Sequence, residues 1–216
     1  MKNRPKNRQF SFLDRCLTEI DHALRTVTTK PRPGRPTPGA CDERNVHTAE
    51  SRLTANLMRV NHSGEIAAQA LYRGQALVAQ DEKLRTELLQ SAGEEHDHLA
   101  WCLERTKELG GGSSLFVPVW YAGSFIIGVA AGLSGDQRSL GFLAETEKQV
   151  AEHLDSHLNQ VPLDDTRSRA ILKQMREDEV KHGHKATEMG GRTPPPPVRT
   201  AMRALSKVMT STSFRI

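Results

Sequence analysis

In four stretches of the chain, apolar residues recur at alternating spacings of three and four positions. In each stretch a glutamate occupies one position where an apolar residue is expected. This spacing is typical of a helix with one face turned to a core. The stretches lie near residues 50–80, 83–109, 137–160 and 165–189, and their glutamates are Glu65, Glu95, Glu147 and Glu179. Acids inside a core are costly unless cations compensate them, so the pattern predicts an all-α bundle that encloses positive charge.

The same acids divide the bundle into two similar halves. A bare glutamate is followed by a Glu-x-x-His pair 30 positions later in one half and 32 positions later in the other. A spacing of three residues places the glutamate and the histidine on one helix face, where both can reach one ion. Such a set is typical of ferritin-like di-iron and di-manganese proteins. We predict a ferritin-like four-helix bundle whose metal ligands are Glu65, Glu95, His98, Glu147, Glu179 and His182.

A single Glu-x-x-His pair is weak evidence, because chance produces it often and most such pairs are solvated. Glu19 and His22 precede a proline-rich linker and have no partner half, so we predict an exposed pair whose loss is nearly silent. We expect His62 and His153 to orient ligands through hydrogen bonds rather than to bind metal. Off the stripes, the following residues are predicted to face solvent or to orient ligands: Glu94, His96, Asp97, Glu152, Asp178 and His184.

Other segments flank the bundle. We expect an N-terminal amphipathic helix within 1–29, a Pro/Gly-rich linker over 30–48, the bundle over 49–191 and a basic amphipathic tail over 192–216. The start of the chain lacks the apolar run of a secretory signal, and the three cysteines are widely spaced, so a reducing compartment fits best. The formal charge of +4 leaves two anionic partners open, nucleic acid and a negatively charged membrane.

Residues 110–135, between the two halves, contain no charged side chain. Their apolar core of about 19 residues is near the lower limit for a membrane span. One crossing would put the two halves of the metal site on opposite sides of a bilayer, so we predict a crossover that dips into one leaflet, with Trp120 and Tyr121 at the interface. The basic tail suits the same surface. A buried crossover or a dimer interface is the alternative.

Four motifs carry a resemblance to a known family. The chain contains, in this order, "NHSGEIAAQALYRGQ", "EEHDHLAW", "ETEKQVAEHLDSHL" and "REDEVKHGHKA", and its first predicted helix begins with "FSFLDR". Over about residues 10–216 it resembles the demethoxyubiquinone hydroxylases of ubiquinone biosynthesis, in their bacterial form. The resemblance assigns the iron ligands to the same six residues. One departure is Leu154, which stands where some members have a tyrosine.

The resemblance implies a non-haem di-iron monooxygenase with two iron ions, O₂ as co-substrate and two electrons from a reductant that stays open, NADH being one alternative. Its implied substrate is 2-polyprenyl-3-methyl-6-methoxy-1,4-benzoquinol. It also implies peripheral, monotopic attachment to the cytoplasmic face of the inner or plasma membrane, accessory proteins of ubiquinone biosynthesis as partners, and no nucleic acid. Two other classes stay open: a ferritin-like ferroxidase or iron-storage protein, and a basic helical adaptor without metal.

Overall fold

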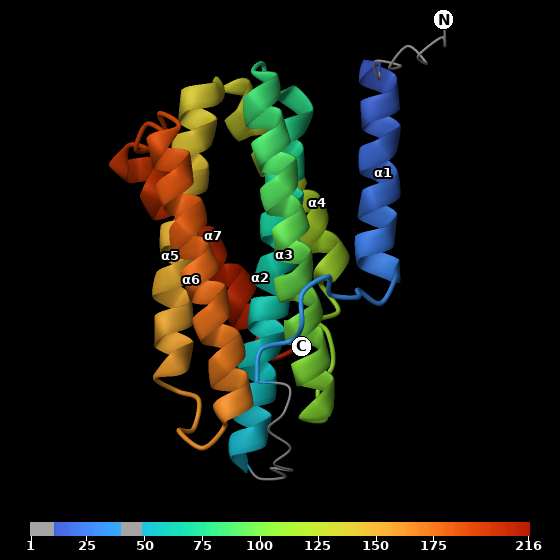
Figure 1. The fold of residues 1–216 in the computed structure, drawn as a ribbon, viewed down its shortest axis with the longest axis vertical. Helices are drawn as coiled ribbons and strands as arrows, with labels where there is room; N and C mark the ends of the chain where they lie inside the picture. Colours follow the sequence, from blue (N-terminus) through green and yellow to red (C-terminus); the bar gives the residue numbers. More distant parts are fainter. Residues whose placement is uncertain (1–10, 40–48) are drawn as a thin grey trace, which may run out of the picture.

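The computed structural model describes residues 11–39 and 49–216, and within these ranges all regular structure is helical. The described helices are α1 (Phe12–Thr28), α2 (Ala49–Val78), α3 (Glu82–Glu108), α4 (Val117–Leu133), α5 (Asp136–Leu158), α6 (Thr166–Glu188) and α7 (Pro196–Ser213). The predicted all-α class is confirmed. Helices α2, α3, α5 and α6 coincide with the four predicted stretches and form the bundle (Figure 1).

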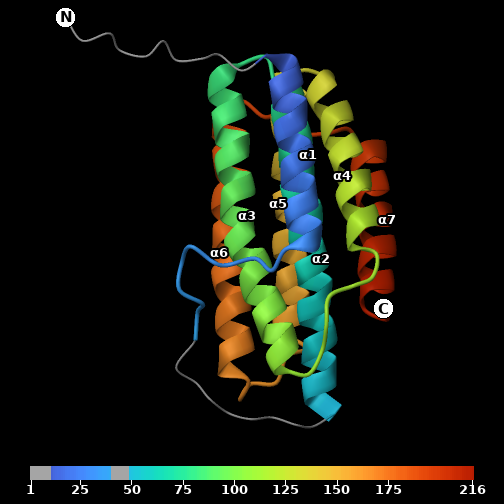
Figure 2. The same ribbon diagram turned by 90° about the vertical axis from the view of Figure 1, so that its right-hand side faces the viewer.

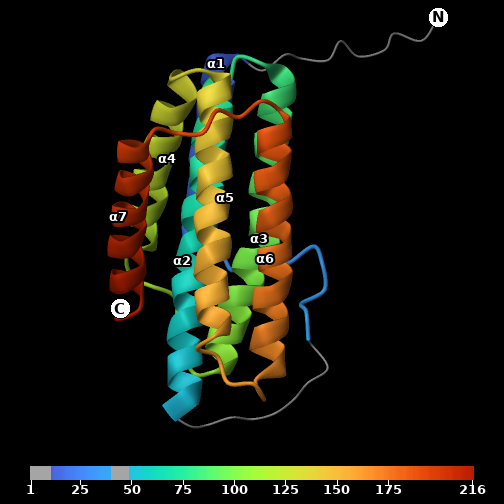
Figure 3. The same ribbon diagram turned by 90° about the vertical axis from the view of Figure 1, so that its left-hand side faces the viewer.

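The bundle consists of two helical hairpins, α2 with α3 and α5 with α6 (Figures 1 and 3). Aspartates start the second helix of each hairpin, because Asp81 accepts a bond from the backbone of Lys83 and Asp165 one from that of Ser168. The buried apolar side chains between the helices form separate clusters. One cluster contains Tyr72, Leu88, Leu140 and Ala186, and another contains Met58, Trp101, Leu154 and Ile171. On all four helices, the stripe glutamate lies between these two clusters in sequence.

Helix α4 packs along α2 on the outside of the bundle (Figure 2), and glycines make the contact close. A Cβ atom at Gly128 would collide with the carbonyl of Leu71, and one at Gly74 would collide with the carbonyl of Phe125. Two backbones can approach this closely only where a side chain is missing. The uncharged crossover is therefore a helix laid against α2. Among the helices of the described ranges, none has the length and apolar character needed to cross a bilayer.

Helix α1 docks on α2 and α4 (Figure 2) through its more polar face. Arg73 of α2 donates two hydrogen bonds to Glu19, at 2.6 and 3.0 Å, and Thr26 donates to Gln69 at 2.8 Å. The prediction that Glu19 is exposed is wrong, because its side chain is only 11% exposed and pairs with a buried arginine. That its replacement is nearly silent stays a prediction, and the buried pair argues against it. The sequence does not show this pair, since its members lie 54 positions apart.

The apolar stripe of α1 faces away from the bundle. Its members are each 57–68% exposed: Leu13, Leu17, Ile20 and Leu24. Helix α7 likewise packs on α2 and α5 and leaves Leu205 and Val208 exposed. Its end is tied down by Arg59 of α2, which donates to the carbonyl oxygens of Ser213 and Phe214 at 2.7 Å each. Apolar side chains therefore remain uncovered on both added helices.

Gly128→Ala should lower the free energy of unfolding by about 1–3 kcal/mol, because the added methyl group pushes α4 away from the backbone of Leu71. Gly123→Ala, on the same helix, adds that group where no atom lies within 4 Å, so it should leave stability unchanged or raise it by up to about 1 kcal/mol. Urea unfolding followed by circular dichroism measures both. Equal stability of the two variants would contradict the close helix contact.

Candidate metal centre

The structure brings all six predicted ligands together inside the bundle. Each is at most 7% exposed. Their donor atoms form two groups, and within each group the atoms lie within 4.8 Å of one another. The groups are Glu65, Glu95, His98 and Glu179, and Glu95, Glu147, Glu179 and His182. Because Glu95 and Glu179 belong to both, the arrangement offers two adjacent positions for cations, each completed by one further glutamate and one histidine.

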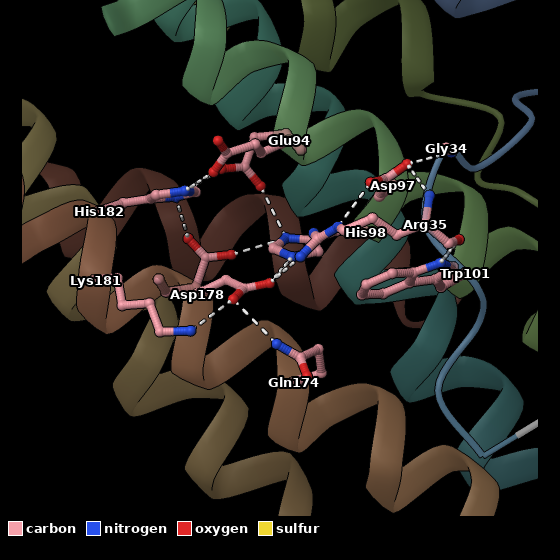
Figure 4. Close-up of polar contacts among 12 residues, drawn as sticks. Gly34, Arg35, Glu94, Asp97, His98, Trp101, Gln174, Asp178, Lys181 and His182 are labelled. Atoms are coloured by element: carbon pink, nitrogen blue, oxygen red, sulfur yellow. Dashed lines mark hydrogen bonds and ion pairs between the residues drawn. The ribbon is translucent and has the colours of Figure 1, made fainter.

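Both histidines turn Nδ1 toward the four glutamates of these groups and Nε2 toward acids outside the groups. Nδ1 of His98 lies 3.0 Å from Glu95, and Nδ1 of His182 lies 3.3 Å from the same side chain. On the other side, Nε2 of His98 lies 3.2 Å from Asp178, and Nε2 of His182 lies 2.6 Å from Glu94 (Figure 4). An acid that accepts a hydrogen bond from Nε2–H keeps the proton on that nitrogen and leaves the lone pair of Nδ1 free to bind a metal ion.

Four buried carboxylates at one place disfavour one another's charge. Burial, together with the charges of Glu179 and Glu95, raises the pKa of Glu147 well above its usual range. Burial is also the main cause that raises the pKa of Glu65, to about 8. Burial disfavours the charged form of His182, but the attraction of Glu95, 3.3 Å away, and of the surrounding acids outweighs burial and raises its pKa to about 9. Without metal, this cluster therefore retains protons at neutral pH.

The residues fit two divalent cations. Several of their buried atoms have no hydrogen-bond partner among the described residues: Oε1 of Glu95, Oε2 of Glu147, Oε1 of Glu179 and Nδ1 of His182. Orphaned buried polar atoms are costly, and a metal ion would satisfy them. Two divalent cations would also balance four carboxylates while both histidines remain neutral. Carboxylate oxygens with imidazole nitrogens suit iron(II) and manganese(II).

Tyr72 is a residue of the centre that the sequence analysis missed. Its side chain is fully buried, and its hydroxyl group donates a hydrogen bond to Oε1 of Glu147. Tyr72 follows Glu65 by seven positions on α2, a spacing that returns to the same helix face and was the available signal. Leu154 stands where some members of the resembled family have a tyrosine, and here Tyr72 places a phenol beside the centre from another helix.

Asp178 and Glu94 lie off the stripes, as predicted, and contact the ligand histidines. Arg35 was missed entirely, although its guanidinium donates to Asp178 at 2.8 Å and to Asp97 at the same distance. An arginine in a proline-rich linker carries no helical spacing that points to a partner. Only the path of the chain in space brings Arg35 beside the centre.

The two histidines predicted to orient ligands lie outside both groups. Burial, with a smaller effect from Lys107, lowers the pKa of His62 to about 4, and its Nδ1 has no hydrogen-bond partner in the described part of the chain. His153 contacts His157 with ring centroids 3.9 Å apart and the rings tilted by 59°, and it lines a cavity of about 270 Å³ together with Phe214. Neither shares a hydrogen bond with the six residues within 11–39 and 49–216. Their roles as ligand-orienting residues stay predictions.

Comparison with known proteins identifies the family. The family model described as "Ubiquinone biosynthesis protein COQ7" matches residues 52–213. Proteins named 3-demethoxyubiquinol 3-hydroxylase are similar along almost the whole chain: those of Ralstonia pickettii and Chromobacterium violaceum are 51% identical and that of Polynucleobacter necessarius 52%, each over 95% of this chain and 100% of its own length. This chain belongs to that family. The predicted resemblance is thereby confirmed.

A solved structure supports the fold separately. The match is a dodecameric thioferritin, the bacterioferritin-related protein from Bacteroides fragilis, with a TM-score of 0.55 at 18% identity. The likeness covers 64% of this chain and 84% of that one. It confirms the ferritin-like bundle and, at this identity, says nothing of the reaction.

The metal-free protein should become less stable as the pH rises. In the metal-free fold the pKa of Glu65 is about 8, against an ordinary value of 4.5. Its contribution to the free energy of unfolding is therefore complete below about pH 4.5 and is lost as the pH rises to about 8. The raised pKa of His182 acts in the same direction from about 6.5 to 9. Metal binding needs deprotonated ligands and strengthens over the same range.

Melting temperatures measured anaerobically between about pH 6.5 and 8 test this expectation, because the opposing effect of the lowered pKa of His62 ends near pH 6.5. The value for metal-free protein should fall, and the gap between iron(II)-loaded and metal-free protein should widen. A gap that does not change with pH would contradict metal binding at these carboxylates.

Proposed function

We propose that this protein is a membrane-associated di-iron monooxygenase that hydroxylates the ring of a demethoxyubiquinol intermediate in ubiquinone biosynthesis, using O₂ and two electrons. The observation that carries the proposal is the pair of overlapping ligand groups, found in a chain that is 51% identical to proteins named 3-demethoxyubiquinol 3-hydroxylase. This near full-length similarity favours hydroxylation over iron storage, since the thioferritin shares only the fold.

The six buried side chains would hold the iron. Glu95 and Glu179 belong to both groups and would contact both ions, while each ion would gain one further glutamate and one histidine. When bound, two ferrous ions in such a set supply the electrons that reduce O₂. A reductant has to restore the ferrous state after each turnover, and NADH is one alternative.

The remaining side chains of the centre orient the ligands and exclude water. The Tyr72 hydroxyl fixes one oxygen of Glu147 and leaves the other without a partner, so a single oxygen is free for metal. Asp178 and Glu94 hold the protons of the two histidines on Nε2. Apolar clusters lie on both sides of the acids along the bundle and keep bulk water out, which strengthens electrostatic interactions inside.

A membrane surface is the partner that the exposed apolar side chains fit. Val119, Ile126 and Leu133 of α4 are 57–70% exposed, although the helix is almost wholly apolar. The outward stripe of α1 and the exposed side chains of α7 supply further uncovered apolar groups. Figure 2 shows α1, α4 and α7 one after another round the outside of α2. A substrate with a polyprenyl tail resides in lipid, so the enzyme has to meet it there. We expect attachment to the cytoplasmic face, with accessory proteins as further partners.

Glu147→Ala or Glu179→Ala should abolish the hydroxylation, because each removes a carboxylate from the centre. The test is complementation of a bacterial strain that lacks its own demethoxyubiquinol hydroxylase, followed by analysis of the extracted quinones. The unaltered chain should restore ubiquinone, and both variants should leave the demethoxy precursor to accumulate. His184→Ala is the matched control, since His184 is exposed on α6 two positions from His182 and should support full synthesis.

Iron analysis of anaerobically purified protein separates the competing functions. About two irons per chain are expected for the hydroxylase. Many irons per chain would support storage instead, and an iron-free chain that does not complement would support the adaptor.

Ile126→Glu should weaken binding to vesicles of phosphatidylethanolamine and phosphatidylglycerol by about tenfold or more, because it replaces an apolar side chain that would enter the lipid with a charge. Flotation of the purified protein with such vesicles measures the bound fraction. Leu163→Glu introduces the same charge at an 83% exposed leucine between α5 and α6, and it should bind as the unaltered protein does. Undiminished binding of the Ile126 variant would show that this face of α4 does not contact the lipid.

A further inference from the structure

Arg35 ties two helices of the metal centre together from a segment outside the bundle. The linker that carries it (residues 30–39) passes over α3 and α6, and Figure 4 shows its side chain between acids of both helices. Its Nε donates to Asp97 of α3 and its Nη1 to Asp178 of α6, each at 2.8 Å. The backbone N–H of Gly34 adds a hydrogen bond of 2.6 Å to Asp97. The linker is thus anchored at the level of the ligands.

Trp101 holds the arginine in this position. Its ring centre lies 4.8 Å from the guanidinium carbon of Arg35, and its indole N–H donates to the Arg35 carbonyl at 3.4 Å. The centre of the same ring lies 5.4 Å from that of the His98 ring. One indole therefore packs against both the arginine and a predicted metal ligand.

Asp178 connects the arginine to the ligand. One of its oxygens, Oδ2, is shared by Nη1 of Arg35 at 2.8 Å and Nε2 of His98 at 3.2 Å. The other oxygen accepts from Gln174 and Lys181 at 3.1 and 3.3 Å. With four donors around it and a side chain only 9% exposed, this carboxylate has a fixed orientation, which in turn fixes the imidazole.

The other half of the centre lacks this support. Nε2 of His182 bonds to Glu94, whose side chain is 40% exposed and is otherwise held by Gln90 alone at 3.0 Å. Across residues 11–39 and 49–216, no arginine forms an ion pair with Glu94. The two histidines therefore occupy equivalent places in the repeated ligand set but differ in how firmly they are held.

We propose that Arg35 is a positioning residue that, through Asp178, fixes His98 and makes the His98 half of the centre the tighter of two unequal metal sites. The inference rests on the di-iron function proposed above. Arg35 touches no ligand itself; it orients His98 before a metal ion arrives, so less ordering is needed on binding. It also precedes residues 52–213, so the linker supplies a support that the matched bundle does not contain.

Cobalt(II) titration of the metal-free, full-length protein tests the proposal, with the visible absorption of bound cobalt as the readout. The unaltered protein should bind two ions with unequal affinities. R35A should weaken one site by about 10- to 100-fold and change the absorption of that site only. R35K should recover only part of the affinity, because an ammonium group keeps the positive charge but lacks the planar fork that pairs with both acids.

T37A is the matched linker variant. It removes a hydrogen bond of 3.0 Å to Glu104 and no contact of the centre, so its affinities should stay within about twofold of the unaltered protein.

Double substitutions identify the affected site. R35A should add nothing to D178N, because both act through the same bond to His98, whereas it should add fully to E94Q, which acts on His182. Unchanged affinities in R35A, or an equal loss at both sites, would overturn the proposal. An unaltered protein that binds fewer than two ions would instead refute the di-iron function.

Discussion

Burial of four carboxylates within one bundle is tolerated only if positive charge accompanies them, and the rest of the structure follows from that requirement. The repeated hairpins deliver the acids to one level, so that two divalent cations would balance them. Asp178 and Glu94 accept hydrogen bonds from Nε2 of the two histidines, so Nδ1 of each is the nitrogen that would bind a metal ion. Apolar clusters on either side lower the local dielectric and strengthen the attraction between cation and carboxylate.

The repeat makes the two halves alike in their ligands, and the added segments make them unlike in their surroundings. On one side, Arg35, packed against Trp101, pairs with the partner acid of His98. On the other side, the partner acid Glu94 is 40% exposed, and His182 lines a small cavity of about 20 Å³. The proposed inequality of the two metal sites rests on this difference in surroundings, because the two groups of candidate ligands are themselves alike.

The clustering of the six candidate ligands could be predicted from the sequence, because an apolar stripe that faces a core admits an acid only where something compensates its charge. Glu147 is the clearest case, as a lone glutamate among alanines and leucines at helical spacing. The contacts of Asp178 and Glu94 with the histidines were harder to predict, because an acid off the stripe has the same spacing in the sequence whether it faces water or an imidazole. Arg35 and the Glu19–Arg73 pair were out of reach, because their contacts depend on where a linker and a first helix dock. Spacing within one helix carries no information about such partners.

Amphipathic spacing also specifies an apolar face without specifying what covers it. The stripe of α1 would suit a protein core, yet the helix docks through Glu19 and Thr26 and turns its leucines outward. Helix α2 connects the uncharged crossover with the candidate metal centre. It carries Glu65 and Tyr72 toward the metal centre and, through Gly74, contacts α4 on its other side. Packed helices lie about 8–10 Å apart, so a single helix layer, α2, separates the uncharged crossover from the acids.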